Sequence, residues 1–388
     1  MAARIVSNRK TAPSSKRCAR LTCVARRTIR PGTGWWMRGA PWRRSSAHWM
    51  ACCRNCWSRA VAEVHPWQQE LWRRLAGRDR HAHAYLLHGP AGIGKRALAE
   101  RLAARLLCQS PAGLEACGQC KSCRLLQAGS HPDHFLLEPE EADKAIRVDQ
   151  VRDLVEFVTQ TAQLGGRKVV LLEPAEAMNS NAANALLKSL EEPSGESVLL
   201  LISHQPSRLL PTIRSRCVQQ ACPLPGAADS LAWLRQALPE QSEAELGELL
   251  VLAGGSPLSA LRLHGEGVRE RRARVVEGVK QLLKQQASAS QLAEAWNSVP
   301  LLLLFDWFCD WSLLILRYQL TGDERGLGLD DMARVVRYLA EKSAQSRVLA
   351  IQDWLLAQRQ RVLAKANLNR VLLLEALLVQ WADLPGPG

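Results

Sequence analysis

Two different patterns of hydrophobic residues divide the chain near position 225. Before it, short apolar runs that indicate buried strands alternate with segments in which apolar residues recur every three or four positions, as in helices. The predicted strands are Tyr85–Leu87, Phe135–Leu137, Lys168–Leu172 and Val198–Ile202. The predicted helices are Ala97–Leu107, a helix opened by Arg147-Val148-Asp149, and Asn181–Glu192, which Pro193 ends. This alternation predicts an α/β domain with a parallel sheet.

Beyond position 225 only the helical pattern remains. Short helices are expected up to about position 265, followed by longer ones in which Val275, Val279 and Leu282 keep helical spacing. The most apolar stretch, Leu301–Leu316, contains two aspartates, so we expect a buried core helix and not a membrane span. Arg370–Trp381 is apolar on two sides, which is typical of a helix packed between other helices or subunits. The predicted fold class is therefore α/β followed by all-α.

The positive charge of the chain is concentrated in its first 60 residues. The formal net charge is +14, but residues 1–60 hold 14 of the 51 basic side chains and no acidic one, so residues 61–388 are formally neutral. A neutral body argues against strong phosphate-driven binding to nucleic acid. The leader lacks the apolar core of a secretory signal, and its Trp and Cys content is unlike that of a mitochondrial presequence. We interpret it as the product of a start codon assigned upstream of a true start near Val61, or as a disordered leader.

A glycine-rich segment lies between the first predicted strand and the first predicted helix. It meets the phosphate-loop pattern Gly-x-x-x-x-Gly-Lys-Ser/Thr at Gly89, Gly94 and Lys95, but Arg96 stands where a hydroxyl would ligate Mg²⁺. The strand–turn–helix context favours a phosphate loop over a chance glycine turn. The end of the Lys168–Leu172 strand is altered too. There a P-loop ATPase needs an Asp for Mg²⁺ and usually a following Glu, whereas this chain has Glu173-Pro174, and a proline cannot act as a base.

Four cysteines lie within sixteen residues, at Cys108, Cys117, Cys120 and Cys123. Clustered thiols in a chain without an export signal favour a metal over disulfides, and four thiolates at short spacings suit a tetrahedral Zn²⁺. Because four protein ligands leave no open position, we expect structural zinc and not a catalytic metal. An iron–sulfur cluster and free thiols are the alternatives, although the run lacks the Cys-Pro that follows in the bacterial iron–sulfur pattern.

A further candidate is the tripeptide Ser215-Arg216-Cys217, which we place just beyond the fifth strand of the sheet. A surface arginine is the ordinary interpretation of such a tripeptide taken alone. Its place at the end of a P-loop sheet makes Arg216 a candidate functional group.

With these motifs in place, residues 61–388 resemble the delta-prime subunits of bacterial DNA polymerase III clamp loaders, which are AAA+ proteins. The features that carry the resemblance are the cysteine spacing, the run Gly129–Asp133, the helix end Leu190–Pro193 and Ser215-Arg216-Cys217. The resemblance implies a P-loop AAA+ domain over residues 61–224 with a zinc module at 108–123, a small helical lid domain over 225–266, and a helical collar domain over 267–388 that joins subunits in a ring.

The resemblance also implies a role for Arg216 and a set of partners. Arg216 would be an arginine finger that reaches the ATP site of a neighbouring gamma or tau subunit, with Ser215 and Cys217 beside it in the motif. The other partners would be the delta subunit and, through the complex, the sliding clamp and primed DNA. The implied location is the cytoplasm, with no membrane contact. Leu258 replaces a sensor arginine of the ATPase subunits, in the segment Gly255-Ser256-Pro257-Leu258.

Arg96, Pro174 and Leu258 each remove a different part of an ATPase: the metal ligand, the base and the phosphate sensor. We therefore expect a non-hydrolysing clamp-loader subunit, which is a component of the polymerase III holoenzyme without ATPase activity of its own. Lys95 can still touch a phosphate, so the residues leave ATP binding open. The alternatives are an active gamma-like clamp-loader ATPase, a zinc-bearing nucleic-acid module, and a P-loop kinase, which would also need the missing metal ligand.

Overall fold

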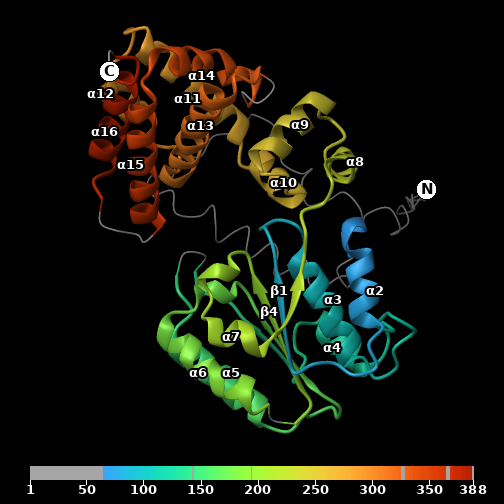
Figure 1. Cartoon of the computed structure of the whole chain (residues 1–388). Helices are drawn as coiled ribbons and strands as arrows, with labels where there is room; N and C mark the ends of the chain where they lie inside the picture. Colours follow the sequence, from blue (N-terminus) through green and yellow to red (C-terminus); the bar gives the residue numbers. More distant parts are fainter. Residues whose placement is uncertain (1–63, 142–143, 194, 325–327, 364–367, 387–388) are drawn as a thin grey trace, which may run out of the picture. The chain divides into compact units, whose positions relative to one another are not determined.

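The chain divides into two compact units, Met1–Gln241 and Ser242–Gly388. The computed structural model describes residues 64–141, 144–193, 195–324, 328–363 and 368–386, so the basic leader lies outside the described residues (Figure 1). The division falls inside the segment expected to form a lid. The three-domain division of residues 61–388 therefore stays a prediction.

The first unit is built on a five-stranded parallel sheet, as the alternation of strands and helices predicted. The strand order is β2-β3-β4-β1-β5. Its strands are β1 (Ala84–His88), β2 (His134–Leu137), β3 (Lys168–Leu172), β4 (Ser197–Ser203) and β5 (Val218–Ala221). Tyr85 of β1 lies opposite Leu200 of β4 on one side and Val218 of β5 on the other.

The placement of Ser215-Arg216-Cys217 beyond the fifth strand was wrong. The tripeptide comes before β5, since Arg216 ends helix α7 (Pro211–Arg216) and β5 starts at Val218. This strand gives little hydrophobic signal because it lies at the edge of the sheet and only Gln220 among its four residues is buried.

Both faces of the sheet are apolar, so each face is covered by helices. Successive residues point to opposite faces: Tyr85 packs with α2 (Gln69–Ala76) and α3 (Lys95–Leu107), whereas Leu86 packs with α5 (Val148–Thr159) and α6 (Ser180–Glu191). Figure 1 shows these two helical layers on either side of the strands. Shorter elements of this unit are η1 (Pro66–Gln68), α4 (Lys121–Gln127), η2 (Ala175–Ala177), η3 (Pro206–Arg208), α7 and α8 (Ala227–Ala237).

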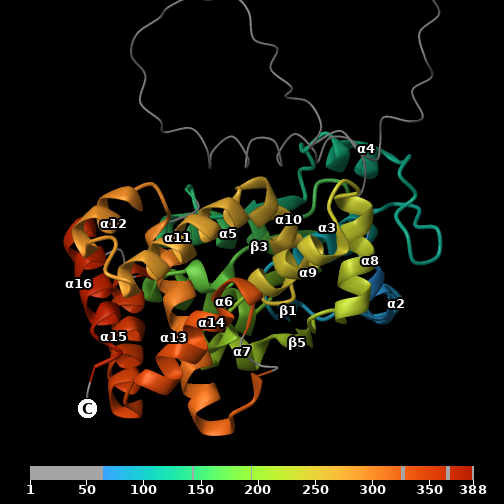
Figure 2. The ribbon, with the colours of Figure 1, turned by 90° about the horizontal axis from the view of Figure 1, so that it is seen from above.

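The second unit is entirely helical within its described residues, as predicted. Its helices are α9 (Glu243–Leu252), α10 (Pro257–Gly265), α11 (Val268–Leu283), α12 (Ala289–Ala295), α13 (Leu301–Thr321), α14 (Asp330–Lys342), α15 (Gln345–Leu363) and α16 (Arg370–Ala382). Helix α13 is the predicted buried core helix, and it packs beside α15 (Figure 2). Aromatic rings fill the centre: the ring centroid of Phe308 lies 4.9 Å from that of Trp311 and 4.8 Å from that of Trp381.

Within the described residues, no single helix is both long and apolar enough to cross a membrane. Two consecutive helices with a bend between them, Glu243–Leu252 and Pro257–Gly265, are together long and apolar enough, but by length and composition only.

Candidate functional site

The glycine-rich segment forms a loop between β1 and α3, as the pattern predicted. Gly89 and Gly94 have φ angles of +150° and +90°, which residues other than glycine rarely adopt. A Cβ at Gly89 would lie 2.1 Å from the carbonyl oxygen of Cys222, and one at Gly94 would lie 2.2 Å from Cδ2 of His65. The glycines are therefore required by both backbone conformation and close packing.

Lys95 is turned onto its own loop. Its ammonium group donates hydrogen bonds to the carbonyl oxygens of Gly89 at 2.6 Å and Pro90 at 2.5 Å, and the residue is only 3% exposed. Burial lowers the pKa of Lys95 to about 8, although nearby Cys222 and Glu173 act in the opposite direction. The lysine that binds phosphate in a phosphate loop is here engaged by the loop itself.

Arg96 has a set of partners that the sequence did not reveal. Its Nε donates to Glu100 at 2.8 Å, and its Nη1 donates to Glu138 and, at 3.2 Å, to Glu173. Glu100 lies one turn along α3, whereas Glu138 follows β2 and Glu173 follows β3. Carboxyl ends of neighbouring parallel strands meet at one edge of a sheet, so a cation in the first turn of α3 can reach both.

The charge of the cluster depends on the burial of Glu173. Its side chain is 14% exposed, and burial raises the pKa of Glu173 to about 7, although Arg96 acts in the opposite direction. Burial also acts to lower the pKa of Arg96, but Glu173 and Glu138 outweigh it and raise that pKa above its ordinary value. Arg96 is therefore permanently charged, and it faces three carboxyl groups.

Side chains that sequence analysis missed cover the last turn of the loop. Trp67 and Gln68 each donate a side-chain hydrogen bond to the carbonyl of Ile93, at 2.9 and 3.0 Å. His65 stacks on Trp67, with ring centroids 4.8 Å apart, and Trp233 of α8 meets both rings edge-on. No motif signalled this packing, because its members come from residues 65–68 and from a helix far along the chain.

Arg216 has contacts that differ from those of the groups around the phosphate loop. Its Nη2 lies 2.7 Å from a carboxylate oxygen of Glu191, at the end of α6, and its Nη1 donates to the carbonyl of Thr212 at 3.1 Å. The side chains of Arg216 and Glu191 are 35% and 49% exposed. An ion pair this exposed is worth about 0–1 kcal/mol, so it holds the guanidinium only loosely.

The neighbours of Arg216 differ in burial. Ser215 is exposed and donates to the carbonyl of Thr212 at 3.1 Å. Cys217 is 8% exposed, packs with the core beneath α5 and α6, and has a pKa that burial raises to about 12. A neutral buried thiol is inert, so Cys217 serves to fix the end of α7 in the core.

The four predicted ligand cysteines come together in one cluster. Their sulfur atoms all lie within 4.8 Å of one another, with Cys108 and Cys120 at 4.0 Å and Cys117 and Cys123 at 4.0 Å. A disulfide needs about 2.05 Å, whereas a tetrahedron with Zn–S bonds of about 2.3 Å has edges of about 3.8 Å. Backbone N–H groups of Cys117, Cys120 and Cys123 also donate to cluster sulfurs. The cluster fits a four-coordinate metal ion.

The cluster is not confined to a loop. Cys108 caps the end of α3, Cys120 caps the start of α4, and Cys123 lies in the first turn of α4. On one side Glu115 ties the connecting segment to helices α3 and α2. Its carboxylate accepts two hydrogen bonds from Arg101, at 2.7 and 2.5 Å, and one from Trp72 at 3.0 Å.

The run Gly129–Asp133 connects the cluster to the sheet. Ser122 of α4 lies 2.7 Å from Nε2 of His131, and Nδ1 of the same ring accepts from the backbone N–H of Asp133 at 3.0 Å. The buried carboxylate of Asp133 accepts from the backbone N–H groups of Gln163 and Leu164, at 2.7 and 2.9 Å. These contacts explain structurally why this polar run lies between a helix and a strand.

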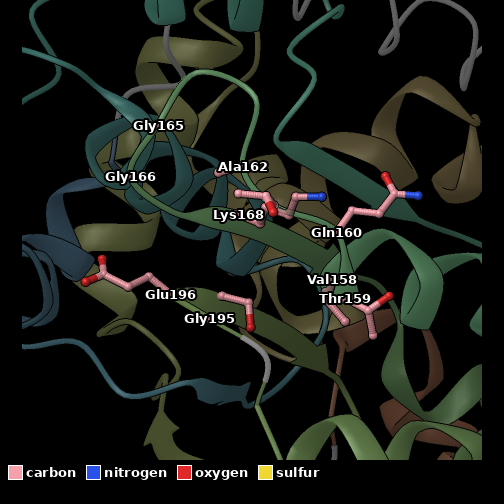
Figure 3. A pocket seen from close by; sticks show the side chains of 11 residues that line it. Val158, Thr159, Gln160, Ala162, Gly165, Gly166, Lys168, Gly195 and Glu196 are labelled. Carbon is pink, nitrogen blue, oxygen red and sulfur yellow. The ribbon is translucent and has the colours of Figure 1, made fainter.

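A hollow of about 410 Å³ opens at the opposite edge of the sheet from the phosphate loop (Figure 3). Its lining comes from the end of α5 and the starts of β3 and β4, with Lys168, Gly195 and Glu196 among the labelled residues. The ammonium of Lys168 donates to the carbonyl of Phe157 at 2.6 Å. The hollow shares no residue with the phosphate loop, the cysteine cluster or Arg216.

Comparisons with known proteins match most of the chain to subunits of one kind. The family model described as "DNA polymerase III, delta subunit" matches residues 64–223, and that described as "DNA polymerase III, delta subunit, C terminal" matches residues 267–383. A Pseudomonas aeruginosa protein named "DNA polymerase III subunit delta'" is 77% identical over 328 residues, which are 84% of this chain and 100% of that protein. An Escherichia coli protein of the same name is 33% identical over 84% of this chain and 97% of its own length.

Among solved structures, a gamma subunit-related protein of DNA polymerase III from Thermotoga maritima is 21% identical. The similarity covers 82% of this chain and 100% of that one, with a TM-score of 0.39. This score is low, and the family assignment rests on the sequence relatives.

Proposed function

The chain belongs to the family of DNA polymerase III delta-prime subunits, and from this membership we propose that it supports loading of the sliding clamp onto primed DNA without hydrolysing nucleotide itself. Its partners in this role are the gamma or tau ATPase subunits and the delta subunit, with the clamp and the DNA engaged through the complex. The same role implies a cytoplasmic location.

One observation carries the proposed lack of hydrolysis. Where a P-loop ATPase needs a hydroxyl and a carboxylate that hold Mg²⁺, this chain has Arg96 bound to Glu173. A guanidinium cannot coordinate the ion, and its own positive charge repels it. Pro174 and Leu258 support the same interpretation, because they stand at positions of the base and of the phosphate-sensing arginine.

Arg216 has the properties that a group acting on a neighbour needs. It is partly exposed, ends a short helix anchored by buried Cys217, and is held by one exposed carboxylate. A guanidinium remains charged at every physiological pH and can bind two phosphate oxygens at once. We assign it the role of an arginine finger in the ATP site of an adjacent subunit, with Ser215 and Cys217 positioning the end of α7.

For the cysteine cluster we assign structural Zn²⁺. Four thiolates at tetrahedral spacing leave no open coordination position, which is typical of a structural site. The ion would join α3 to α4, and through Ser122 and His131 it would support the start of β2.

The second unit is assigned the collar role, in which its helices contact other subunits. Exposed apolar residues recur at intervals of seven on three of its helices, and such spacing places them on one face of each helix. They are Leu313 and Leu320 on α13, Leu349, Leu356 and Leu363 on α15, and Leu372 and Val379 on α16.

Changing both Leu349 and Leu356 to Gln is expected to weaken assembly and leave the fold intact. The two side chains are 48% and 45% exposed in the single chain, and burying a leucine contributes roughly 1.5–3 kcal/mol. Analytical ultracentrifugation with the partner subunits should show an affinity at least about tenfold lower. The exposed change Glu341→Gln on α14 is the control, and equal assembly by both variants would refute this assignment.

ATP turnover by the isolated full-length chain distinguishes the proposal from a gamma-like ATPase. With Mg²⁺ present we expect none above a buffer blank, while the same preparation still assembles with its partners. Turnover that follows the protein through purification would favour the active ATPase instead.

The other alternative, a zinc-bearing nucleic-acid module, predicts DNA binding. Binding of DNA by residues 61–388 with an affinity that falls steeply as salt is added would favour that module.

A further inference from the structure

Three structural elements of the first unit meet at the guanidinium of Arg96. The arginine belongs to the first turn of α3, Glu138 follows β2, and Glu173 follows β3. Contacts from one guanidinium to both glutamates therefore connect the loop after β1 with the two strands on the far side of β4.

The position of this cation in the sequence pattern is informative. A phosphate loop places its Mg²⁺ between the hydroxyl after the lysine and a carboxylate at the end of a neighbouring strand. Arg96 replaces that hydroxyl, and Glu173 stands at the end of that strand. The positive charge of the side chain thus lies between the same two elements that a metal ion would join.

The charges around the loop do not suit an incoming phosphate. Glu100, Glu138 and Glu173 surround Arg96 and have side chains that are 9%, 33% and 14% exposed. The nearby ammonium of Lys95 is bound to the carbonyls of its own loop. A triphosphate entering here would meet carboxylates that are neutralised only while Arg96 remains bound to them.

We infer that Glu138 and Glu173 form a cation site whose permanent occupant is the chain's own Arg96. The guanidinium takes the place of a divalent ion, holds the ends of β2 and β3 against α3, and keeps Mg²⁺–nucleotide out. This inference deepens the proposed lack of hydrolysis at the same loop. Its test measures only metal binding and stability, so its failure would leave the role of Arg216 untouched.

Arg96→Ser tests this site directly, because it removes the resident cation and restores the hydroxyl of the pattern. In chelator-free buffer, with zinc content checked, we expect the melting temperature of the full chain to fall by about 5 °C. Adding MnCl₂ should restore most of this loss, and electron spin resonance should show bound Mn²⁺. The wild-type chain should show neither bound Mn²⁺ at this site nor a change in melting temperature.

Two further variants separate this site from general effects. Arg96→Ser combined with Glu173→Gln should lose the response to Mn²⁺, because one of the two ligand carboxylates is gone. Arg101→Ser lies on the same helix and also loses a carboxylate partner, Glu115, but should gain no Mn²⁺ response.

The inference is overturned if Arg96→Ser melts like the wild type, if Mn²⁺ leaves its melting temperature unchanged, or if the wild type responds equally. If Arg96→Ser does not fold without metal, we expect soluble protein from growth and purification in excess MgCl₂. Failure to fold in both buffers overturns the inference as well.

Discussion

Arg216→Ala is expected to lower ATP turnover at the neighbouring subunit's site by on the order of 10³, the lower end of the effect of an arginine finger. The reason is that the guanidinium is permanently positive and stabilises the negative charge of the transferring phosphate group in the transition state, and this stabilisation is lost. Assembly should be unchanged, since the side chain makes one exposed ion pair and one backbone hydrogen bond within its own chain. The measurement is DNA-stimulated ATPase activity of the complex reconstituted with gamma-type subunits.

Two matched variants show whether the effect belongs to this guanidinium. Arg208→Ala removes another arginine of the first unit and should leave turnover unchanged. Within the described residues, the side chain of Arg208 donates a hydrogen bond only to Gln205. Arg216→Lys keeps the charge but loses the fork of two N–H donors, so it should recover only part of the activity. Turnover by the Arg216→Ala complex at the wild-type rate would refute the finger assignment.

Cys120→Ser is expected to release the metal ion and to destabilise the first unit strongly. Apparent binding free energies of structural zinc in small peptides are about 10–16 kcal/mol, and the part of this energy that is coupled to folding is lost with the site. Cys120 also caps α4, and its sulfur accepts from the backbone N–H of Cys123, so the start of that helix loses support as well. Metal content by mass spectrometry and thermal unfolding followed by circular dichroism provide the measurement.

Cys309→Ser is the control for this change. Cys309 is buried in α13 of the second unit, outside the cluster, so its variant should keep a full equivalent of metal. Iron and acid-labile sulfide in the wild-type protein would indicate an iron–sulfur cluster instead. An unchanged metal content in Cys120→Ser would mean that the four thiols are not the ligands.

The central elements of the fold could be predicted because their signals are local. Val169 and Val170 pack on opposite faces of the sheet, so a fully buried strand is continuously apolar and easy to recognise. The edge strand β5 could not be predicted in this way, because three of its four residues are exposed. Its absence from the predicted strands explains why Arg216 was placed on the wrong side of it.

The site was predictable to the extent that its residues are close in sequence. The cysteine spacing predicted a cluster because all four ligands come from one segment of sixteen residues. Two of the three partners of Arg96 lie 42 and 77 residues away, and their meeting depends on the strand order, which no local pattern encodes. The sequence therefore showed that a metal ligand is missing, whereas the structure shows which carboxylates contact the arginine that replaces it.

We propose that this chain contributes an arginine to a neighbour's ATP site but has no nucleotide site of its own. The most direct test counts the ADP–aluminium fluoride, an analogue of the transition state of phosphoryl transfer, that the reconstituted complex traps. We expect Arg216→Ala to trap one equivalent fewer per complex than the wild type, and photo-crosslinking of the trapped nucleotide to leave the loop at Lys95 of this chain unlabelled. Equal trapping by both complexes, or labelling of this chain at Lys95, would contradict the claim.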